Sequence, residues 1–97
     1  MIKYREGYEI DYIRLTELLA EAGLNDIPTD FKYLSGMVES SKSVVTAWDF
    51  DYMVGFARLP GDEETDRKIN IIVDNEYKDQ GIEEELKKRI EVSQTLF

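Results

Sequence analysis

Two segments rich in β-branched and aromatic residues lie only four residues apart, and this spacing constrains the fold more than any other feature of the sequence. Ser43–Trp48 and Met53–Leu59 have the composition of strands. The polar and aromatic residues 49–52 between them form a turn, so the two segments are expected to pair as a hairpin. A third strand is expected at Lys68–Val73, where isoleucine and valine residues indicate burial on both faces.

The chain before this hairpin predicts a short strand and a helix. Ile2–Tyr4 begins the chain as a strand, and Gly7 ends it. A helical pattern follows Asp11, which is a candidate N-cap, and Gly23 lies where a C-terminal glycine belongs. The apolar residues of this helix recur at i, i+3, i+4 and i+7 and are Leu15, Leu18, Leu19 and Ala22.

Two further helices are predicted. One begins near Thr29 or Asp30, either of which can accept an N–H of the first turn. Its apolar face consists of Phe31, Leu34 and Val38, with Met37 alongside. The last helix runs from about Gln80 to Val92, and its inner line is Ile82, Leu86 and Ile90. The order is β-α-α-β-β-β-α, which indicates an α+β or mixed α/β fold with helices packed on a sheet.

Composition excludes several classes of function. The chain has 97 residues, which predicts one domain, and it contains neither Cys nor His. A thiol nucleophile, a Ser-His-Asp triad, a disulfide framework and an ordinary zinc site are therefore excluded. The net charge of −9 argues against binding to nucleic acid or to anionic membranes. No spanning segment or signal-peptide core is evident, so a cytoplasmic protein is expected.

The segment from Ile69 to Leu86 joins a strand, a tight turn and a helix with a glycine near its start. Free N–H groups at such a helix start form an anion site, for which phosphate is the usual guest. Taken alone, this junction is structural more often than functional, because glycine also serves turns. Both readings stay open from the residues alone.

The same segment resembles the acyl-CoA-binding core of the GNAT family of N-acetyltransferases. That family has an Arg/Gln-x-x-Gly-x-Gly/Ala signature after a strand and a turn. Here Asn75-Glu76-Tyr77 occupies the turn, Lys78 the Arg/Gln place and Gly81 the first glycine, while Glu83 stands at the second glycine or alanine. The segments 44–49 and 54–58 are similar to the family's second and third strands. The resemblance covers almost the whole chain, as one GNAT-like domain over residues 1–97 with a mostly antiparallel sheet.

The resemblance implies direct transfer of an acetyl group from acetyl-CoA to an amine. Ile71, Ile72 and Val73 would line the pantetheine arm of acetyl-CoA. Lys78, Gly81 and Ile82 would hold its pyrophosphate. A general base would deprotonate the ammonium of the acceptor, but no catalytic residue is assigned from the sequence. The acidic surface would suit a small-molecule or protein amine, such as a polyamine or a lysine side chain.

Two departures from the family pattern favour an alternative function. Carboxylates at Asp79 and 83–85 surround the place of the two phosphates, with Lys78 as the nearby positive charge. Family members also continue through another strand and helix, which this sequence lacks. The alternative is therefore a GNAT-fold binding or interaction protein that has lost acyl-CoA binding. An acidic decoy that mimics nucleic acid is a third and weaker hypothesis, and it rests only on the net charge.

Three smaller expectations complete the sequence reading. The open edge of the last strand would be covered by a partner, with a homodimer as the first hypothesis. The acidic loop that carries Glu63, Glu64 and Asp66 is expected to be a solvated surface rather than the source of a general base. Trp48 and Phe56 are expected in the core rather than in a substrate site.

Overall fold

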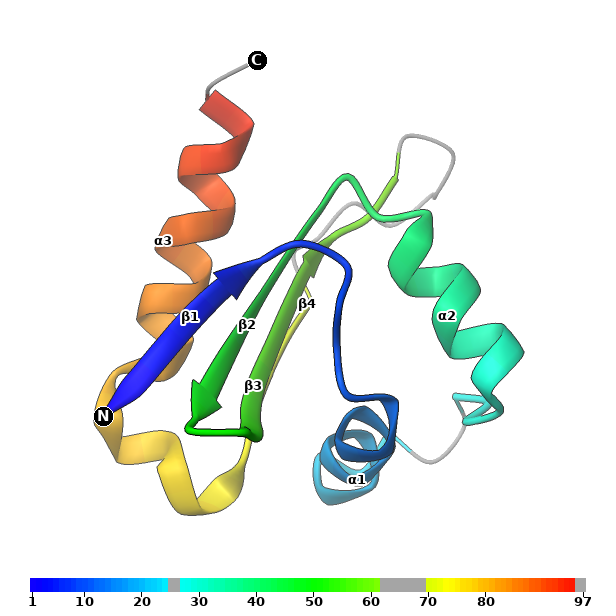
Figure 1. Ribbon diagram of the computed structural model, residues 1–97, viewed down its shortest axis with the longest axis horizontal. Coiled ribbons are helices and arrows are strands. Elements are labelled where there is room, and N and C mark those ends of the chain that lie inside the picture. Colours follow the sequence, from blue (N-terminus) through cyan, green and yellow to red (C-terminus); the bar gives the residue numbers. More distant parts are fainter. Residues whose placement is uncertain (25–26, 62–69, 96–97) are drawn as a thin grey trace.

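The computed structural model describes residues 1–24, 27–61 and 70–95, with side chains up to Val92. Its elements follow the predicted order, with a short 3-10 helix (η1) before the last α-helix (Figure 1). The elements are β1 (Ile2–Glu6), α1 (Tyr12–Glu21), α2 (Phe31–Glu39), β2 (Ser43–Asp49), β3 (Tyr52–Leu59), β4 (Asn70–Val73), η1 (Asn75–Gln80) and α3 (Ile82–Thr95).

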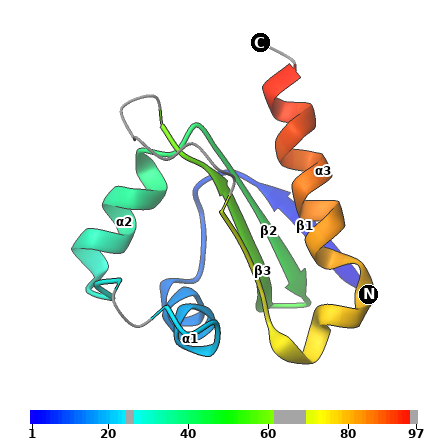
Figure 2. The same ribbon diagram turned by 180° about the vertical axis from the view of Figure 1, so that it is seen from behind.

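The four strands form one antiparallel sheet in the order β1-β2-β3-β4. The β2–β3 hairpin is confirmed, with Ser43 opposite Leu59 and Asp49 opposite Tyr52. A register shift between Ala47 and Trp48 interrupts this pairing. The fold is a mixed α+β architecture with helices on both faces of the sheet: α1 and α2 cover one face and α3 covers the other (Figures 1 and 2).

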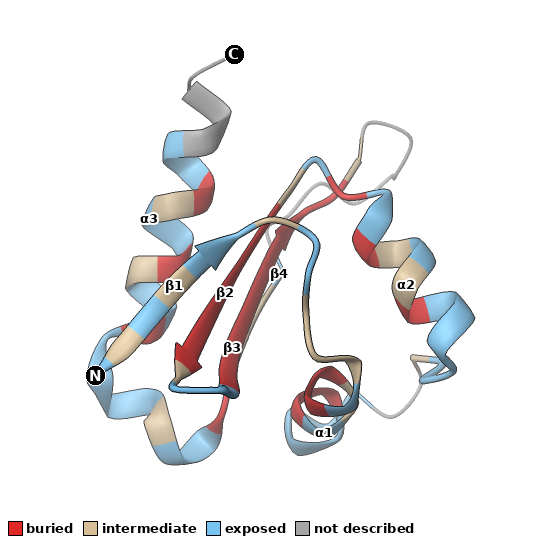
Figure 3. Cartoon of the chain, viewed as in Figure 1, coloured by how far each residue is buried: buried red, intermediate tan, exposed pale blue. Residues whose placement is uncertain are grey.

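Two apolar clusters, one on each face, explain why β2 and β3 are buried along most of their length (Figure 3). Trp48 and Phe56 belong to the cluster beneath α1 and α2, so both expectations of core positions are confirmed. The cluster beneath α3 contains Ala47 and Ala57 on the sheet and three residues of the helix. These three are Ile82, Leu86 and Ile90, all fully buried, which confirms the predicted inner line.

The predicted N-caps of the first two helices are also confirmed. The Asp11 side chain accepts hydrogen bonds from two N–H groups of α1, and the Asp30 side chain accepts one from Tyr33 of α2. Gly23 ends α1 with a φ of +77°, as its predicted place at the C-terminus requires. Phe31 does not belong to the buried face of α2, contrary to the prediction, and is 66% exposed. It lies in the first turn of the helix and contacts the Tyr12 ring edge-on rather than the core.

The structure corrects the sequence reading around the last strand and helix. β4 begins at Asn70, and the earlier part of the predicted strand and the acidic loop lie outside the described residues. Ile71 and Ile72 face opposite clusters but are only half-buried, because β4 is an edge strand. The α-helix begins at Ile82 rather than at Gln80, because η1 continues to Gln80 and Gly81 then adopts a φ of +71°.

Within the part of the chain that the structure describes, β4 pairs with β3 alone. The expected open edge is therefore present among these residues, and its coverage by a second copy stays a prediction. None of the described helices is long and apolar enough to cross a membrane.

Candidate functional site

The junction between η1 and α3 presents an unusual helix start. The Gly81 carbonyl accepts the first hydrogen bond of α3, from the Glu85 N–H at 3.1 Å, so Gly81 is the N-cap of this helix. A helix leaves the N–H groups of its first turn without intrahelical partners. Asp side chains accept such groups in α1 and α2, but a glycine N-cap has no side chain to do so. A Cβ at Gly81 would meet no atom within 4 Å, so the space on that side of Gly81 is open.

The turn before this helix is held by one hydrogen bond within itself and by hydrogen bonds to two other elements, β3 and α1. The Asp74 N–H donates to the Val54 carbonyl at 2.8 Å, and the Asp74 carboxylate accepts from the Glu76 N–H at 2.9 Å. The Asn75 N–H donates to the Glu21 carboxylate at the end of α1, also at 2.8 Å. These contacts fix the start of η1 against α1 and the hairpin.

Tyr77 attaches the turn to a third element, the strand β2. Its hydroxyl donates to the Asp49 carboxylate on β2 at 2.7 Å. This hydrogen bond, the desolvation of the ring and the negative charges of Asp49 and Asp74 raise the pKa of Tyr77 above its ordinary value. The hydroxyl therefore remains protonated, and remains a donor, throughout the neutral range.

A buried arginine that the sequence reading did not single out completes this network. Arg14 of α1 donates from Nε to the Met53 carbonyl at 2.8 Å and forms an ion pair with Asp74 at 2.8 Å. Its guanidinium also lies 4.0 Å from the ring centroid of Tyr52. Burial alone would lower the pKa of Arg14, but the hydrogen bonds to Glu17 and Asp74 outweigh it and raise the pKa. In the sequence, the only sign that the Arg14 side chain is buried is its position next to Leu15 of the predicted apolar face.

Charges of both signs lie around the N-terminus of α3. Lys78 and Asp79 are exposed in the last turn of η1, and Glu83 and Glu84 are exposed in the first turn of α3. Glu85 differs from these because it forms an ion pair with Arg89 at 2.8 Å. The predicted carboxylates around this helix start are thus present, and the charge of one of them, Glu85, is balanced by Arg89 one helical turn later.

The sequence-predicted site residues lie on one continuous stretch of β4, η1 and α3. Ile71, Ile72 and Val73 form β4, whose outer edge faces away from β3. The Ile82 side chain is fully buried in the core, so only its backbone N–H could contact a phosphate. Gly81 joins these residues to Lys78 of η1.

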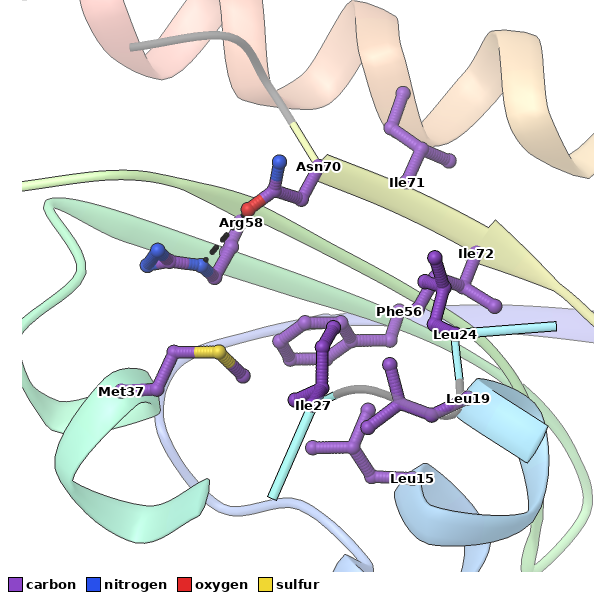
Figure 4. A pocket seen from close by; sticks show the side chains of 10 residues that line it. All are labelled: Leu15, Leu19, Leu24, Ile27, Met37, Phe56, Arg58, Asn70, Ile71 and Ile72. Atoms are coloured by element: carbon purple, nitrogen blue, oxygen red, sulfur yellow. Dashed lines mark hydrogen bonds between the residues drawn. The ribbon is translucent and has the colours of Figure 1, made fainter. Parts of the chain in front are cut away.

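A cavity of about 410 Å³ lies on the α1–α2 face of the sheet, beside β4 (Figure 4). Most of its lining is aliphatic or aromatic. The lining residues are Leu15, Leu19, Leu24, Ile27, Met37, Phe56, Arg58, Asn70, Ile71 and Ile72. The Arg58 Nε donates to the Asn70 side-chain oxygen at 3.1 Å, and another of its nitrogens donates to the Ser41 hydroxyl at 3.1 Å. The sequence reading missed this cavity, because helices and strands far apart in the chain line it together.

Among the described residues, no group of three or more carboxylates lies close enough together to hold a metal ion. Two carboxylates near the junction accept hydrogen bonds, Asp49 from the Tyr77 hydroxyl and Asp74 from Arg14. The carboxylates of the acidic loop, Glu63, Glu64 and Asp66, lie outside the described residues.

The fold defined by this sheet and its helices is that of GNAT-family acetyltransferases. A GNAT-family acetyltransferase from Streptococcus pneumoniae TIGR4 superposes with a TM-score of 0.68 at 25% identity, over 92% of this chain and 64% of that one. An aminoglycoside acetyltransferase from an uncultured soil metagenomic sample, in complex with trehalose, superposes with a TM-score of 0.68 at 21% identity, over 97% of this chain and 70% of that one. The same enzyme in complex with sisomicin gives a TM-score of 0.67 at 22% identity and the same coverage.

The chain therefore spans less than two thirds of the length of the streptococcal acetyltransferase. No protein-family model and no curated protein matches the sequence. The similarity thus rests on the fold, and the fold resemblance expected from the sequence is confirmed at that level.

Proposed function

We propose that this protein binds acetyl-CoA along β4 and the start of α3, and transfers the acetyl group to an amine. The observation that carries the proposal is the glycine N-cap of α3. Gly81 has no side chain to cap the first-turn N–H groups of the helix, and this helix start follows the edge strand β4 after one short 3-10 helix. The acetyltransferases that share the fold support the same class of reaction.

Each part of acetyl-CoA has a candidate partner in this arrangement. The open backbone edge of β4 offers N–H and C=O groups to the amide groups of the pantetheine arm. The N–H groups at the start of α3, beginning with Ile82, would donate to the pyrophosphate, and Lys78 would add a positive charge. The N–H groups point along the helix axis, so they need no rearrangement to accept an anion.

The reaction needs a neutral amine beside the thioester. The amine nitrogen attacks the thioester carbonyl carbon, a C–N bond forms, the C–S bond breaks, and the CoA sulfur leaves as a thiolate. The amine proton passes to water or to the departing thiolate. The main contribution of the protein is to hold the two reactants in this geometry, which lowers the barrier.

The acidic residues near the helix start support a second candidate function, which is a non-catalytic binding protein with the same fold. Glu83 and Glu84 are exposed in the first turn, where they stabilise the helix dipole by about 0.3–1 kcal/mol each. The same charges repel a pyrophosphate. In this second candidate function, the protein keeps the fold but does not bind acyl-CoA.

Calorimetric titration of the whole chain with acetyl-CoA at low salt tests the proposal, with free CoA as the control. Binding at tens of micromolar or tighter, followed by release of free CoA in the presence of an amine, is the expected result. An absence of heat and of any shift in melting temperature at millimolar acetyl-CoA would reject the proposal and favour the non-catalytic candidate.

A further inference from the structure

We infer that Tyr77 is a positioning residue for acetyl-CoA, because its hydrogen bond to Asp49 fixes the direction in which the start of α3 meets the pyrophosphate. The inference rests on the proposed function, since it assigns a role within that binding site. It is carried by the attachments of the chain on either side of Gly81 and by the strand to which Tyr77 is bonded.

The backbone that carries the candidate pyrophosphate site is attached at its two ends. In the described part of the chain, no side chain between Tyr77 and Gly81 forms a hydrogen bond or an ion pair. On one side, the Ile82 side chain is fully buried in the cluster beneath α3. On the other side, the Tyr77 ring packs against the same cluster, and its hydroxyl donates to Asp49 at 2.7 Å. The course of residues 78–81 therefore depends on these two attachments.

Asp49 is a rigid partner for this hydroxyl. It is the last residue of β2, where it pairs with Ile2 on β1 and with Tyr52 on β3. Because β3 lies between β2 and β4, the hydrogen bond reaches across the end of the sheet, where η1 lies beside the β2–β3 turn (Figures 1 and 2). Contacts of residues 74–75 hold the start of η1, whereas Tyr77 holds its middle and so sets the direction of its last turn.

The direction of this turn matters because consecutive N–H groups must converge on one anion. A hydrogen bond weakens steeply when its donor is misaligned, so a small rotation of the helix start lowers the affinity for phosphate. Gly81 has a φ of +71° and, as a glycine, resists rotation less than any other residue. The hydrogen bond of Tyr77 supplies the restraint that the glycine lacks.

The test compares two ligands in the whole chain and its variants. Acetyl-CoA carries the pyrophosphate, whereas S-acetylpantetheine has the same thioester and pantetheine arm without it. Tyr77→Phe keeps the ring and removes the hydroxyl, and it is expected to raise the Kd for acetyl-CoA by at least about threefold. The Kd for S-acetylpantetheine, measured from the NMR shifts of the β4 amides, is expected to stay the same. Tyr33→Phe on α2 is the matched control and is expected to change neither Kd.

Variants of Asp49 separate the hydrogen bond from the charge and give a second route if Tyr77→Phe does not fold. Asp49→Asn removes the charge but keeps an oxygen that can accept from Tyr77, whereas Asp49→Ala removes both. The asparagine variant is expected to bind acetyl-CoA nearly as tightly as the parent, and the alanine variant as weakly as Tyr77→Phe. Tyr77→Phe combined with Asp49→Ala is expected to weaken binding no further, because either change alone already removes the hydrogen bond.

Two kinds of result would overturn the inference, and they differ in what they say about the proposed function. If the parent binds acetyl-CoA and Tyr77→Phe binds it equally well, or if Asp49→Asn binds as weakly as Asp49→Ala, the hydrogen bond does not position the site. The inference is equally wrong if both ligands weaken by the same factor, since Tyr77 then acts on the whole fold. In each of these cases the proposed function survives. If the parent binds no acetyl-CoA, the proposed function fails, and the role of Tyr77 fails with it.

Discussion

Arg14 on α1 and Asp74 at the end of β4 form a buried ion pair at 2.8 Å, although sixty positions separate them in the chain. The two side chains are each only 7% exposed. Asp74 also accepts the Glu76 N–H that starts η1, so the pair links α1 to the turn that precedes the candidate pyrophosphate site. The geometry of that site therefore depends on a residue of the first helix.

Replacement of this arginine by methionine is expected to destabilise the protein strongly. Arg14→Met keeps an apolar stem but leaves the Asp74 carboxylate buried without its cation and the Met53 carbonyl without its donor. Breaking a buried pair from one side costs about 3–5 kcal/mol of unfolding free energy. Urea unfolding followed by circular dichroism measures the loss.

Arg89→Met is the control for this substitution. Its pair with Glu85 is 42% and 34% exposed and spans one helical turn, so the loss is expected to remain below about 1 kcal/mol. If Arg14→Met and Arg89→Met lower the unfolding free energy equally, the buried Arg14–Asp74 pair matters no more for stability than the exposed pair.

Local signals in the sequence predicted the elements of this fold well. Spacing identified Ile82, Leu86 and Ile90 as one face. Residue type identified Asp11 as one cap and narrowed the other to Thr29 or Asp30, of which Asp30 is the cap in the structure. These predictions hold because periodicity and capping depend on neighbours within a few positions. The same logic placed the hairpin, whose strands need only a short turn between them.

The contacts that organise the site escaped prediction because they are long-range. The Tyr77–Asp49 hydrogen bond and the wall of the cavity at Phe56 join elements that only the folded chain brings together. The late start of α3 has a local cause that was misread: Gly81 has a positive φ, so it separates η1 from the helix instead of continuing a helix begun at Gln80.

Gly55→Ala is expected to destabilise the protein by about 1–3 kcal/mol, because α3 lies very close to β3 at this glycine. An added Cβ would lie 3.1 Å from the Leu86 side chain and 3.2 Å from those of Ala47 and Ile82. All three neighbours are packed in the core and have little room to move. Thermal and urea unfolding measure the loss.

Gly36→Ala on α2 is the matched control for this change. A Cβ there meets nothing within 4 Å, and alanine is the better helix former by about 0.5–1 kcal/mol. The two variants are therefore expected to shift stability in opposite directions. A Gly55→Ala protein as stable as the parent would show that α3 can move away from the sheet without cost.

Tyr77→Phe is expected to change how stability depends on alkaline pH. The folded state raises the pKa of Tyr77 above the 10.0 of a free tyrosine, mainly through the hydrogen bond to Asp49. The stabilisation is thus fully present below about pH 10 and is lost as the pH rises through the higher folded pKa. The variant should be less stable than the parent at pH 7, and this difference should shrink above pH 10.

Urea unfolding at pH 7, 9, 10 and 11 checks this prediction. Tyr33→Phe serves as the control, because no hydrogen bond of the Tyr33 hydroxyl is found within the described part of the chain. Tyr33→Phe thus removes a phenol hydroxyl without removing a described hydrogen bond, and it measures the effect of losing the hydroxyl alone. A Tyr77→Phe difference that stays constant up to pH 11 would contradict the role of the phenol hydroxyl as a donor to Asp49.

The carboxylates beside the candidate pyrophosphate site are expected to weaken the binding of acetyl-CoA. Asp79→Asn with Glu83→Gln removes two exposed charges on either side of Gly81 and keeps the shape of both side chains. Because exposed charges are well screened, each removal is expected to contribute roughly 0.2–1 kcal/mol, which together gives about a two- to thirtyfold lower Kd for acetyl-CoA. Calorimetry at two ionic strengths measures the change, and the gain should shrink at the higher salt concentration.

Glu39→Gln with Glu91→Gln is the control pair for this experiment. It changes the net charge by the same amount, at exposed positions at the end of α2 and late in α3. If the control pair lowers the Kd as much as the pair at the junction, general charge governs binding rather than local repulsion at Gly81. If neither pair alters the Kd, the pyrophosphate does not bind at the start of α3, and the acidic residues there serve only to stabilise the helix.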